Sequence, residues 1–367
     1  MNRSAIPSWS SSMLRRDLSD RAHQLARAQN TLHDISPGPN PIVIFGQDEH
    51  GHHGNFHPGS YARIQANPAW LRRLTKPHTA SRRSRARKDW QWMELDTCNS
   101  SDALLMNIFW HPAVFDGNTI APRVARLLNI DPHTQPRFGI TPGVPLKNSR
   151  KGRSKLPVQR TDRTEIDLHL GNLFIEAKLT ESNFQTAAPR LVERYRDLEA
   201  VFDTARLPRK LLSVPSSHPP VEDYSQDEVN TEPENSRPTT SLSFRPDPER
   251  SRGGVEKPAS LPPPSQENSY DEFEIQPETP RQTTRTLING YQLIRNVLAA
   301  YDADAAFCVL SDARRHDLIE TWYSILSAVH SPTFATRLKL LTWQELSTTL
   351  PHDLQQFLEA KYGITPA

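Results

Sequence analysis

The residues best suited to chemistry gather in one short stretch of this chain, residues 164–178. Within it, Asp167 is followed by Glu176 and, two positions later, by Lys178. Carboxylates are the protein ligands that Mg²⁺ takes together with water and substrate phosphate oxygens. An ammonium group beside such an ion can orient a water molecule or stabilise charge on a phosphate in transfer. These residue types indicate metal-assisted chemistry on a phosphate, provided that the fold brings them together.

The same stretch has the pattern of a β-hairpin. Apolar residues alternate with mostly polar ones over 165–170 and again over 173–178, and Gly171-Asn172 separates the two runs. Glycine accepts the positive φ that a two-residue turn requires at its first central position, and asparagine tolerates the left-handed region at the second. We therefore predict two antiparallel strands joined by a tight turn.

The tight turn fixes which side chains face one another. Asp167 is expected opposite Glu176, and Glu165 opposite Lys178, so that four ionisable side chains share one face. Two carboxylates placed directly opposite on a sheet repel each other at a cost of about 0.2–1 kcal/mol, which a divalent cation would offset. The alternative is a solvated edge hairpin in which Glu165 and Lys178 form a surface ion pair.

An aspartate, a short hairpin and then Glu176-Ala177-Lys178 resemble the active site of the PD-(D/E)XK nuclease superfamily, which has the restriction-endonuclease-like fold. This chain has Ile166 where the motif has a proline, which is often absent in the superfamily. The resemblance implies that Asp167 and Glu176 bind Mg²⁺ or Mn²⁺, with the Ala177 carbonyl as a further ligand. Lys178 would position the attacking water. The implied activity is that of a Mg²⁺-dependent (endo)nuclease that hydrolyses phosphodiester bonds of nucleic acid, with DNA as the expected substrate.

Three more residues are expected at this site. Glu165 lies on the same face of the hairpin, and Asp102 stands in the first turn of a predicted helix that often supplies a further acid in the superfamily. A carboxylate there also interacts favourably with the helix dipole, so a structural role for Asp102 stays open. Gln292 resembles a glutamine that some members place near the site. An amide on the helix surface is the alternative.

The flanking segments predict an α/β (α+β) fold with a mixed central sheet flanked by helices, as the resemblance requires. A helix over 103–110 begins after the capping candidates Asn99-Ser100-Ser101 and ends before Pro112. The apolar run 305–310 is typical of a strand buried on both faces and reached by a helical crossover. The other predicted elements are helices over 123–129, 183–203, 290–301, 318–329 and 354–362, and a strand over 338–343.

Composition divides the chain. Residues 213–281 hold 13 of the 32 prolines, with 14 acidic and 6 basic residues. Their net charge of −8, set against +2 for the whole chain, leaves +10 for the remainder. Such a segment cannot bury enough apolar area to offset its ordering entropy, so we expect a disordered acidic tether between basic folded parts. The predicted divisions are an N-terminal basic, partly ordered extension (1–95), the insertion (213–283), and two halves of the nuclease-like core (96–212 and 284–367).

Basic residues of the folded part concentrate in two places. One cluster precedes the first core helix, near Trp70, Trp90 and Trp92, and the other, over 147–163, immediately precedes the hairpin. Basic side chains supply salt-dependent phosphate affinity, and tryptophan can stack on bases. A solvated basic loop with its tryptophans in the core is the alternative. The residues expected to contact nucleic acid are Lys147, Arg150, Lys151, Arg153, Lys155, Arg82, Arg83, Arg85 and Arg87.

Histidines and cysteines give weaker signals. The histidine-rich segment 48–57 has no cysteine nearby, whereas structural zinc sites usually draw on two spaced ligand pairs that commonly include cysteine, so we expect a polar loop. Only Cys98 and Cys308 are present, which indicates a reducing compartment rather than a disulfide framework.

The N-terminal thirty residues contain no apolar run fit for a signal peptide, and no segment approaches about 18 apolar residues. We therefore expect a soluble, cytoplasmic protein with no membrane partner.

Two other functions fit the same residues. The fold with a silent site would be a nucleic-acid-binding module that uses the basic clusters. Alternatively, the acidic tether would recruit a partner, and the chain would be an interaction protein.

Overall fold

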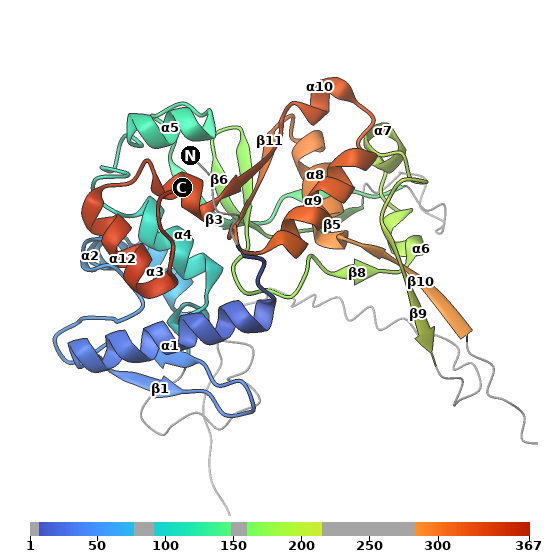
Figure 1. The fold of residues 1–367 in the computed structure, drawn as a ribbon. Coiled ribbons are helices and arrows are strands. Elements are labelled where there is room, and N and C mark those ends of the chain that lie inside the picture. Colours follow the sequence, from blue (N-terminus) through green and yellow to red (C-terminus); the bar gives the residue numbers. More distant parts are fainter. Residues whose placement is uncertain (1–6, 77–91, 148–159, 215–282) are drawn as a thin grey trace, which may run out of the picture. The chain divides into compact units, whose positions relative to one another are not determined.

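A five-stranded sheet carries the predicted hairpin in its middle (Figure 1). The structure is a computed structural model that describes residues 7–76, 92–147, 160–214 and 283–367. The segments Met1–Leu212 and Arg285–Ala367 form one compact unit. In spatial order, the strands of the sheet are β12 (Leu338–Thr342), β11 (Ala306–Ser311), β7 (Leu173–Ala177), β6 (Ile166–Leu170) and β3 (Pro136–Ile140).

The strand directions make this sheet mixed. β6 pairs antiparallel with both β3 and β7, whereas β11 pairs parallel with both β7 and β12. Parallel neighbours cannot be joined by a tight turn. The chain accordingly enters β11 from helix α8 (Tyr291–Asp302) and passes through α9 (His316–Ala328) before β12. The predicted fold class, a mixed α/β sheet flanked by helices, is confirmed.

Helices and short strands surround the sheet. Helix α4 (Ser101–Phe109) starts after Ser100, whose hydroxyl accepts a hydrogen bond from the Ala103 N–H, as the sequence predicted. The remaining elements are α1 (Ser11–Gln29), β1 (His33–Ile35), β2 (Val43–Phe45), α2 (Pro58–Ala66), α3 (Pro68–Leu74), the 3₁₀ helix η2 (Glu94–Asp96), α5 (Pro122–Leu128), β4 (Gly143–Pro145), β5 (Thr161–Arg163), β8 (Thr186–Ala187), α6 (Pro189–Val192), α7 (Leu198–Val201), β9 (Arg209–Val214), β10 (Thr283–Asn289), α10 (Pro332–Ala335), α11 (Trp343–Ser347) and α12 (His352–Tyr362).

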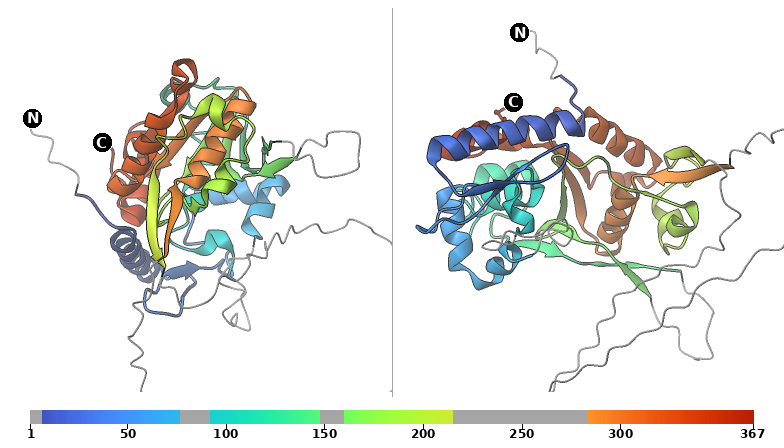
Figure 2. Two further views of the ribbon diagram at one scale, coloured as in Figure 1. Left: turned by 90° about the vertical axis from the view of Figure 1, so that its right-hand side faces the viewer. Right: turned by 90° about the horizontal axis from the view of Figure 1, so that it is seen from below.

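Each face of the sheet packs against its own helices (Figure 2). On one face, Ile175 and Leu310 share a core with residues of α1, α4 and α12. On the other face, Phe174 and Val309 share a core with residues of α8 and α9. Successive side chains of a strand point to opposite faces, so Glu176 lies on the same side as Phe174 and faces α8.

The hairpin has the predicted register. Leu170 pairs with Leu173, and His169 pairs with Phe174. Gly171 has φ +61°, and a Cβ at this position would lie 2.9 Å from the Thr134 hydroxyl oxygen, so both conformation and space require glycine. Asn172 does not adopt a positive φ, contrary to the expectation for the second turn position. The left-handed region is therefore used only at the first position.

The predicted helix over 183–203 is wrong. This segment forms β8 and the two short helices α6 and α7. Pro189 has no N–H to continue a preceding helix and instead begins α6. Tyr195 forms a bridge with Leu146, and its hydroxyl donates to Asp162 at 2.6 Å. These long-range contacts override the helical spacing of the apolar residues.

The boundaries of the insertion also differ slightly from the prediction. Strand β9 continues to Val214 and β10 begins at Thr283, so both strands reach into the predicted range 213–283. Residues 215–282 lie outside the described part of the chain. The predicted extension 1–95 contains the long helix α1, which the sequence analysis did not identify. Within the described ranges, no helix combines the length and apolarity needed to cross a membrane.

Candidate active site

A cavity of about 350 Å³ lies at the ends of the hairpin strands, beside α4 and α8. Its wall contains all of the residues that the sequence predicted for catalysis and metal binding. They come from the hairpin, from the peptide that follows it, and from two helices on either side of it in the sequence. The predicted residues in the wall are Asp102, Glu165, Asp167, Glu176, Ala177, Lys178 and Gln292.

Glu176 is the most enclosed acid of this cavity, with 0% of its surface exposed. Its Oε1 accepts hydrogen bonds from Lys178 Nζ and Gln292 Nε2, both at 2.7 Å. Its Oε2 accepts one from Asn296 Nδ2, also at 2.7 Å. Burial raises the pKa of Glu176 above its ordinary value, although the Lys178 ammonium opposes this shift. Three donors therefore fix the carboxylate in one orientation.

Asp167 lies next to Glu176 in the cavity wall. Its Oδ2 accepts a hydrogen bond from the Ala177 N–H at 2.8 Å. Burial, together with the charges of Glu176 and Asp102, raises the pKa of Asp167 well above its ordinary value. The wall of the cavity contains more carboxylates than cationic side chains, and a hard divalent cation with oxygen ligands would supply further positive charge. The carboxylate oxygens that line the cavity are therefore suitable ligands for such an ion.

Lys178 is a buried cation, only 7% exposed. Burial favours its neutral form, but the carboxylates of Glu176, Glu181 and Asp167 outweigh that effect and raise the pKa of Lys178 above its ordinary value. The side chain consequently stays protonated at neutral pH. It can donate hydrogen bonds and offset negative charge in the cavity, but it is not a proton acceptor.

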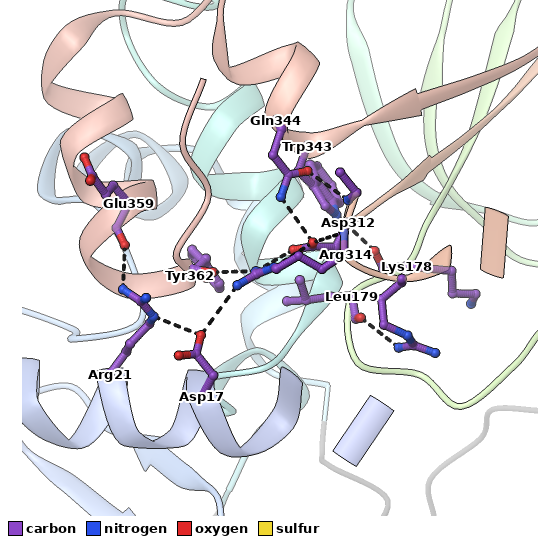
Figure 3. A network of polar contacts seen from close by, with 12 residues as sticks. Asp17, Arg21, Lys178, Leu179, Asp312, Arg314, Trp343, Gln344, Glu359 and Tyr362 are labelled. Carbon is purple, nitrogen blue, oxygen red and sulfur yellow. Dashed lines mark hydrogen bonds and ion pairs between the residues drawn. The ribbon is translucent and has the colours of Figure 1, made fainter. Parts of the chain in front are cut away.

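Side chains from the C-terminal part of the chain hold the peptide at Lys178. The Trp343 indole N–H donates to the Lys178 carbonyl at 2.9 Å (Figure 3). The Arg315 guanidinium donates to the carbonyls of Leu179 and Glu181, at 3.1 and 2.8 Å. The strand end that carries the lysine is thus fixed from outside the hairpin.

The same region anchors the N-terminal helix. Arg314 forms an ion pair with Asp312 at 2.6 Å and approaches Asp17 of α1 at 3.5 Å (Figure 3). It also donates to the carbonyl of Tyr362 at 2.9 Å. One guanidinium therefore joins α1, the loop after β11 and the end of α12. Arg15, also in α1, lines the cavity.

The ion pair between Glu165 and Lys178, which the alternative of a solvated edge hairpin requires, is not formed. Glu165 binds Arg73, with Nη1 at 2.6 Å from Oε1, and approaches Lys76 at 3.5 Å. Lys178 binds Glu176 instead. A fully buried carboxylate interacts more strongly with an ammonium than the Glu165 side chain, which is 41% exposed.

Asp102 is in the first turn of α4, as predicted, and is nearly buried. Its partner is the second terminal nitrogen of Arg73, which donates to Asp102 Oδ2. Gln292 is not a free surface amide, because it binds Glu176. Both residues therefore face the cavity.

Several polar residues of the cavity were missed in the sequence. Asn296 follows Gln292 by four positions and so shares its helix face, a signal that the sequence contained. Arg73 and Lys76 belong to the basic cluster that precedes the first core helix, which was expected to contact phosphate rather than to line this cavity. Glu181 follows Lys178 by three positions, whereas Arg15 and Glu94 come from segments far from the hairpin, where no local pattern marks them.

The predicted nucleic-acid contacts fall mostly outside the described residues. Lys147 is described and forms an exposed ion pair with Glu199 at 3.0 Å. Trp70 stacks on Trp110, and Trp92 is buried, so both belong to the fold rather than to a free stacking surface. The predicted residues that lie outside the described ranges are Arg82, Arg83, Arg85, Arg87, Trp90, Arg150, Lys151, Arg153 and Lys155.

A histidine cluster brings a second group of ligand-type side chains together. Potential ligand atoms of His57, His111 and Asp353 lie within 4.8 Å of one another. The Nε2 atoms of His111 and His57 lie 3.2 and 3.8 Å from Asp353 Oδ2. The Nδ1 atoms, however, accept the backbone N–H groups of Gly59 and Ala113, each at 3.2 Å.

These contacts decide the tautomer in the histidine cluster. Burial lowers the pKa of both His57 and His111, which favours neutral rings. A neutral imidazole that accepts at Nδ1 carries its proton at Nε2. Both Nε2 atoms therefore point an N–H at Asp353 rather than a lone pair at a metal ion. The hydrogen bond from His111 to Asp353 joins the loop after α4 to the first turn of α12, and His57 at the start of α2 lies beside it.

The sheet and its cavity together define a mixed α/β protein with a polar, acidic site at the ends of the central strands. The model of a family described as restriction endonuclease associating with ARP matches residues 21–226 and 235–363. Because the match covers most of the chain, the chain belongs to this family. No curated protein and no solved structure matches it. Apart from Arg15, every residue of the cavity wall lies within the matched ranges.

Proposed function

We propose that this protein is a nuclease of the PD-(D/E)XK type that uses Mg²⁺ or Mn²⁺ to hydrolyse phosphodiester bonds, with DNA as its substrate. The observation that carries the proposal is the convergence of Asp167, Glu176 and Lys178 in one polar cavity. Membership of a restriction-endonuclease family supports a nuclease-like role and a nucleic-acid substrate. The family description also supports a protein partner for this chain.

In this proposal, Asp167 and Glu176 hold the divalent ion, with the Ala177 carbonyl as a further ligand. The bound ion would act as a Lewis acid on the phosphate and lower the pKa of the attacking water. Gln292 and Asn296 keep Glu176 in position, because each donates a hydrogen bond to one of its oxygens.

Lys178 has a separate role in the reaction. Its ammonium keeps its proton beside Glu176, so it orients the water by donating a hydrogen bond and offsets the charge that develops on the phosphate. Since the cavity wall is pre-assembled around this lysine, the favourable interaction requires little rearrangement when substrate binds.

Cleavage of a supercoiled plasmid in the presence of Mg²⁺ tests the proposal. We expect activity that chelation abolishes and that falls by at least about a hundredfold in Asp167→Asn and in Lys178→Met. Matched controls are Asp304→Asn, which alters an exposed ion pair, and Lys210→Met, which alters an exposed side chain of β9, and neither residue lines the cavity. Equal cleavage by the site variants and the controls would refute the assignment.

One observation favours a second function, a catalytically silent module that binds nucleic acid. Both carboxylate oxygens of Glu176 already accept hydrogen bonds from side chains, three in all, so this carboxylate is satisfied without a metal ion. DNA binding without cleavage in Mg²⁺ or Mn²⁺, unchanged in Glu176→Gln, would identify this alternative.

A further inference from the structure

The acidic cavity has two halves, each with its own carboxylates. One half contains Asp167 and Glu176, the proposed ion ligands, together with Lys178. The other half contains Asp102 and Glu165, which reach the cavity from α4 and from the residue before β6. A second pair of carboxylates in the same cavity is also suited to a divalent ion, and two-ion sites are common in phosphodiester hydrolysis.

The second half already contains a cation, the guanidinium of Arg73. Its Nη1 lies 2.6 Å from Glu165 Oε1, and its Nη2 donates to Asp102 Oδ2. The side chain is 13% exposed, and it comes from α3, far from the hairpin in the sequence. Charge-assisted bonds of a planar guanidinium to two carboxylates are among the stronger polar contacts in proteins.

The Arg73 guanidinium lies close to the backbone at Gly139, where there is no side chain. Gly139 in β3 has φ +60°, and a Cβ at Gly139 would lie 2.8 Å from Arg73 Nη1 and 3.3 Å from Glu165 Oε1. A side chain at this position would therefore displace both groups of the ion pair. The position of Arg73 thus depends on a glycine in the central sheet, which distinguishes it from a mobile surface arginine.

We infer that Arg73 takes the place of a second metal ion, so that the site binds a single divalent ion per chain, at Asp167 and Glu176. This inference rests on the proposed function for the first ion position. It also assigns Asp102 and Glu165 a different role from the one suggested by the sequence. They hold Arg73 rather than complete the shell of the ion.

Counting bound Mn²⁺ by electron paramagnetic resonance tests the inference without an activity assay. We expect one Mn²⁺ in the wild-type protein and a second in Arg73→Met, which frees Asp102 and leaves Glu165 with only its longer contact to Lys76, at 3.5 Å. Arg72→Met is the matched control, because Arg72 is exposed on the same helix and does not line the cavity. The double variant Arg73→Met, Asp102→Asn should lose the second ion.

Two ions in the wild-type protein would overturn the inference, whether or not any variant folds. An unchanged count in a folded Arg73→Met protein, verified by circular dichroism, would also overturn it. Asp167→Asn distinguishes a failure of this inference from a failure of the proposed function. This substitution should remove only the ion held by Asp167 and Glu176. If the wild type binds no Mn²⁺ while Arg73→Met binds one that Asp102→Asn abolishes, the role of Arg73 stands and the first ion position is refuted.

Discussion

The acidic cavity and the histidine cluster contain similar ligand types but differ in what already satisfies them. In the cavity, burial and the charges of neighbouring carboxylates raise the pKa of Asp167, so a further positive charge would stabilise its carboxylate form. In the cluster, His57 and His111 bind backbone N–H groups through Nδ1 and turn their remaining N–H groups toward Asp353. Proximity of ligand atoms is therefore a weaker criterion for a metal site than the hydrogen bonds that surround them.

Two buried lysines, one in the acidic cavity and one in α12 outside the histidine cluster, differ in a similar way. Lys178 has carboxylate neighbours, which raise its pKa. Lys361, in α12, lies over the ring of Phe45 at 4.1 Å, and its Nζ is 3.3 Å from the carbonyl of Gly54. Burial lowers the pKa of Lys361 to about 7. The same residue type is thus a fixed cation in one region and a titrating group in the other.

The largest expected effect is on cleavage activity, which should depend on the acidic cavity and not on the histidine cluster. Glu176→Gln should lower Mg²⁺-dependent cleavage by at least about a hundredfold, because it removes a charged ligand and the partner of Lys178. His111→Asn should leave cleavage within about twofold of wild type, because its partner is Asp353 and it does not line the acidic cavity. Plasmid cleavage rates measure both, and an equal loss in the two variants would remove the distinction.

The next effect concerns stability in the acidic cavity. Asn296→Leu leaves Glu176 Oε2 without its amide donor in a buried position, which should lower the free energy of unfolding by about 1–3 kcal/mol. Urea denaturation measures this change. Gln355→Leu is a control on a half-buried amide that donates to backbone carbonyls outside the cavity. A smaller loss in Asn296→Leu than in the control would show that Glu176 does not depend on Asn296.

A third prediction concerns pH and Lys361. Between pH 7 and 10.5, the unfolded chain binds a proton at Lys361 that the folded chain does not, because burial lowers the folded pKa from 10.5 to about 7. The contribution of this residue to stability should therefore rise with pH across that window, by roughly 1 kcal/mol per unit, and fall as pH decreases toward 7. Denaturation of wild type and Lys361→Met at pH 7 and pH 9 isolates this contribution, and parallel pH dependence of the two proteins would contradict it.

The smallest expected effect is the absence of a specific zinc response in the histidine cluster. Zn²⁺ at low micromolar concentration should shift the melting temperature equally in wild type and in His57→Asn, because the proton at Nε2 keeps that lone pair from the metal. A stabilisation by Zn²⁺ that His57→Asn abolishes would show that the tautomer changes on binding, and that the cluster is a metal site after all.

Local patterns in the sequence predicted the hairpin and its register, because alternation and the turn at Gly171 act over a few residues. They also predicted α4 and β11, which have a clear capping residue and a continuous apolar run. The same reasoning failed over 183–203, where Tyr195 is held by residues distant in the sequence.

The rest of the site could not be predicted from local sequence patterns, for a related reason. Arg73 enters the cavity from α3, and its position depends on Gly139 in a strand that has no obvious signature. The pairing of Glu165 with Lys178 was expected from register alone, but competition for charge in three dimensions gave Glu165 a different partner. Pairing along a sheet follows from sequence periodicity, whereas the pairing of charges depends on which groups are buried together.

The hydrogen bonds to Glu176 have a consequence for the order in which the protein is made. Asp167 and Glu176 leave the ribosome before the insertion, whereas Gln292, Asn296 and Trp343 follow it. An unfinished chain therefore contains the acids but lacks the amides that orient Glu176, the indole that holds the peptide at Lys178, and two strands of the sheet. The proposed nuclease would stay inert as a nascent chain and become competent to cut nucleic acid only after the segment that carries Gln292, Asn296 and Trp343 has been made.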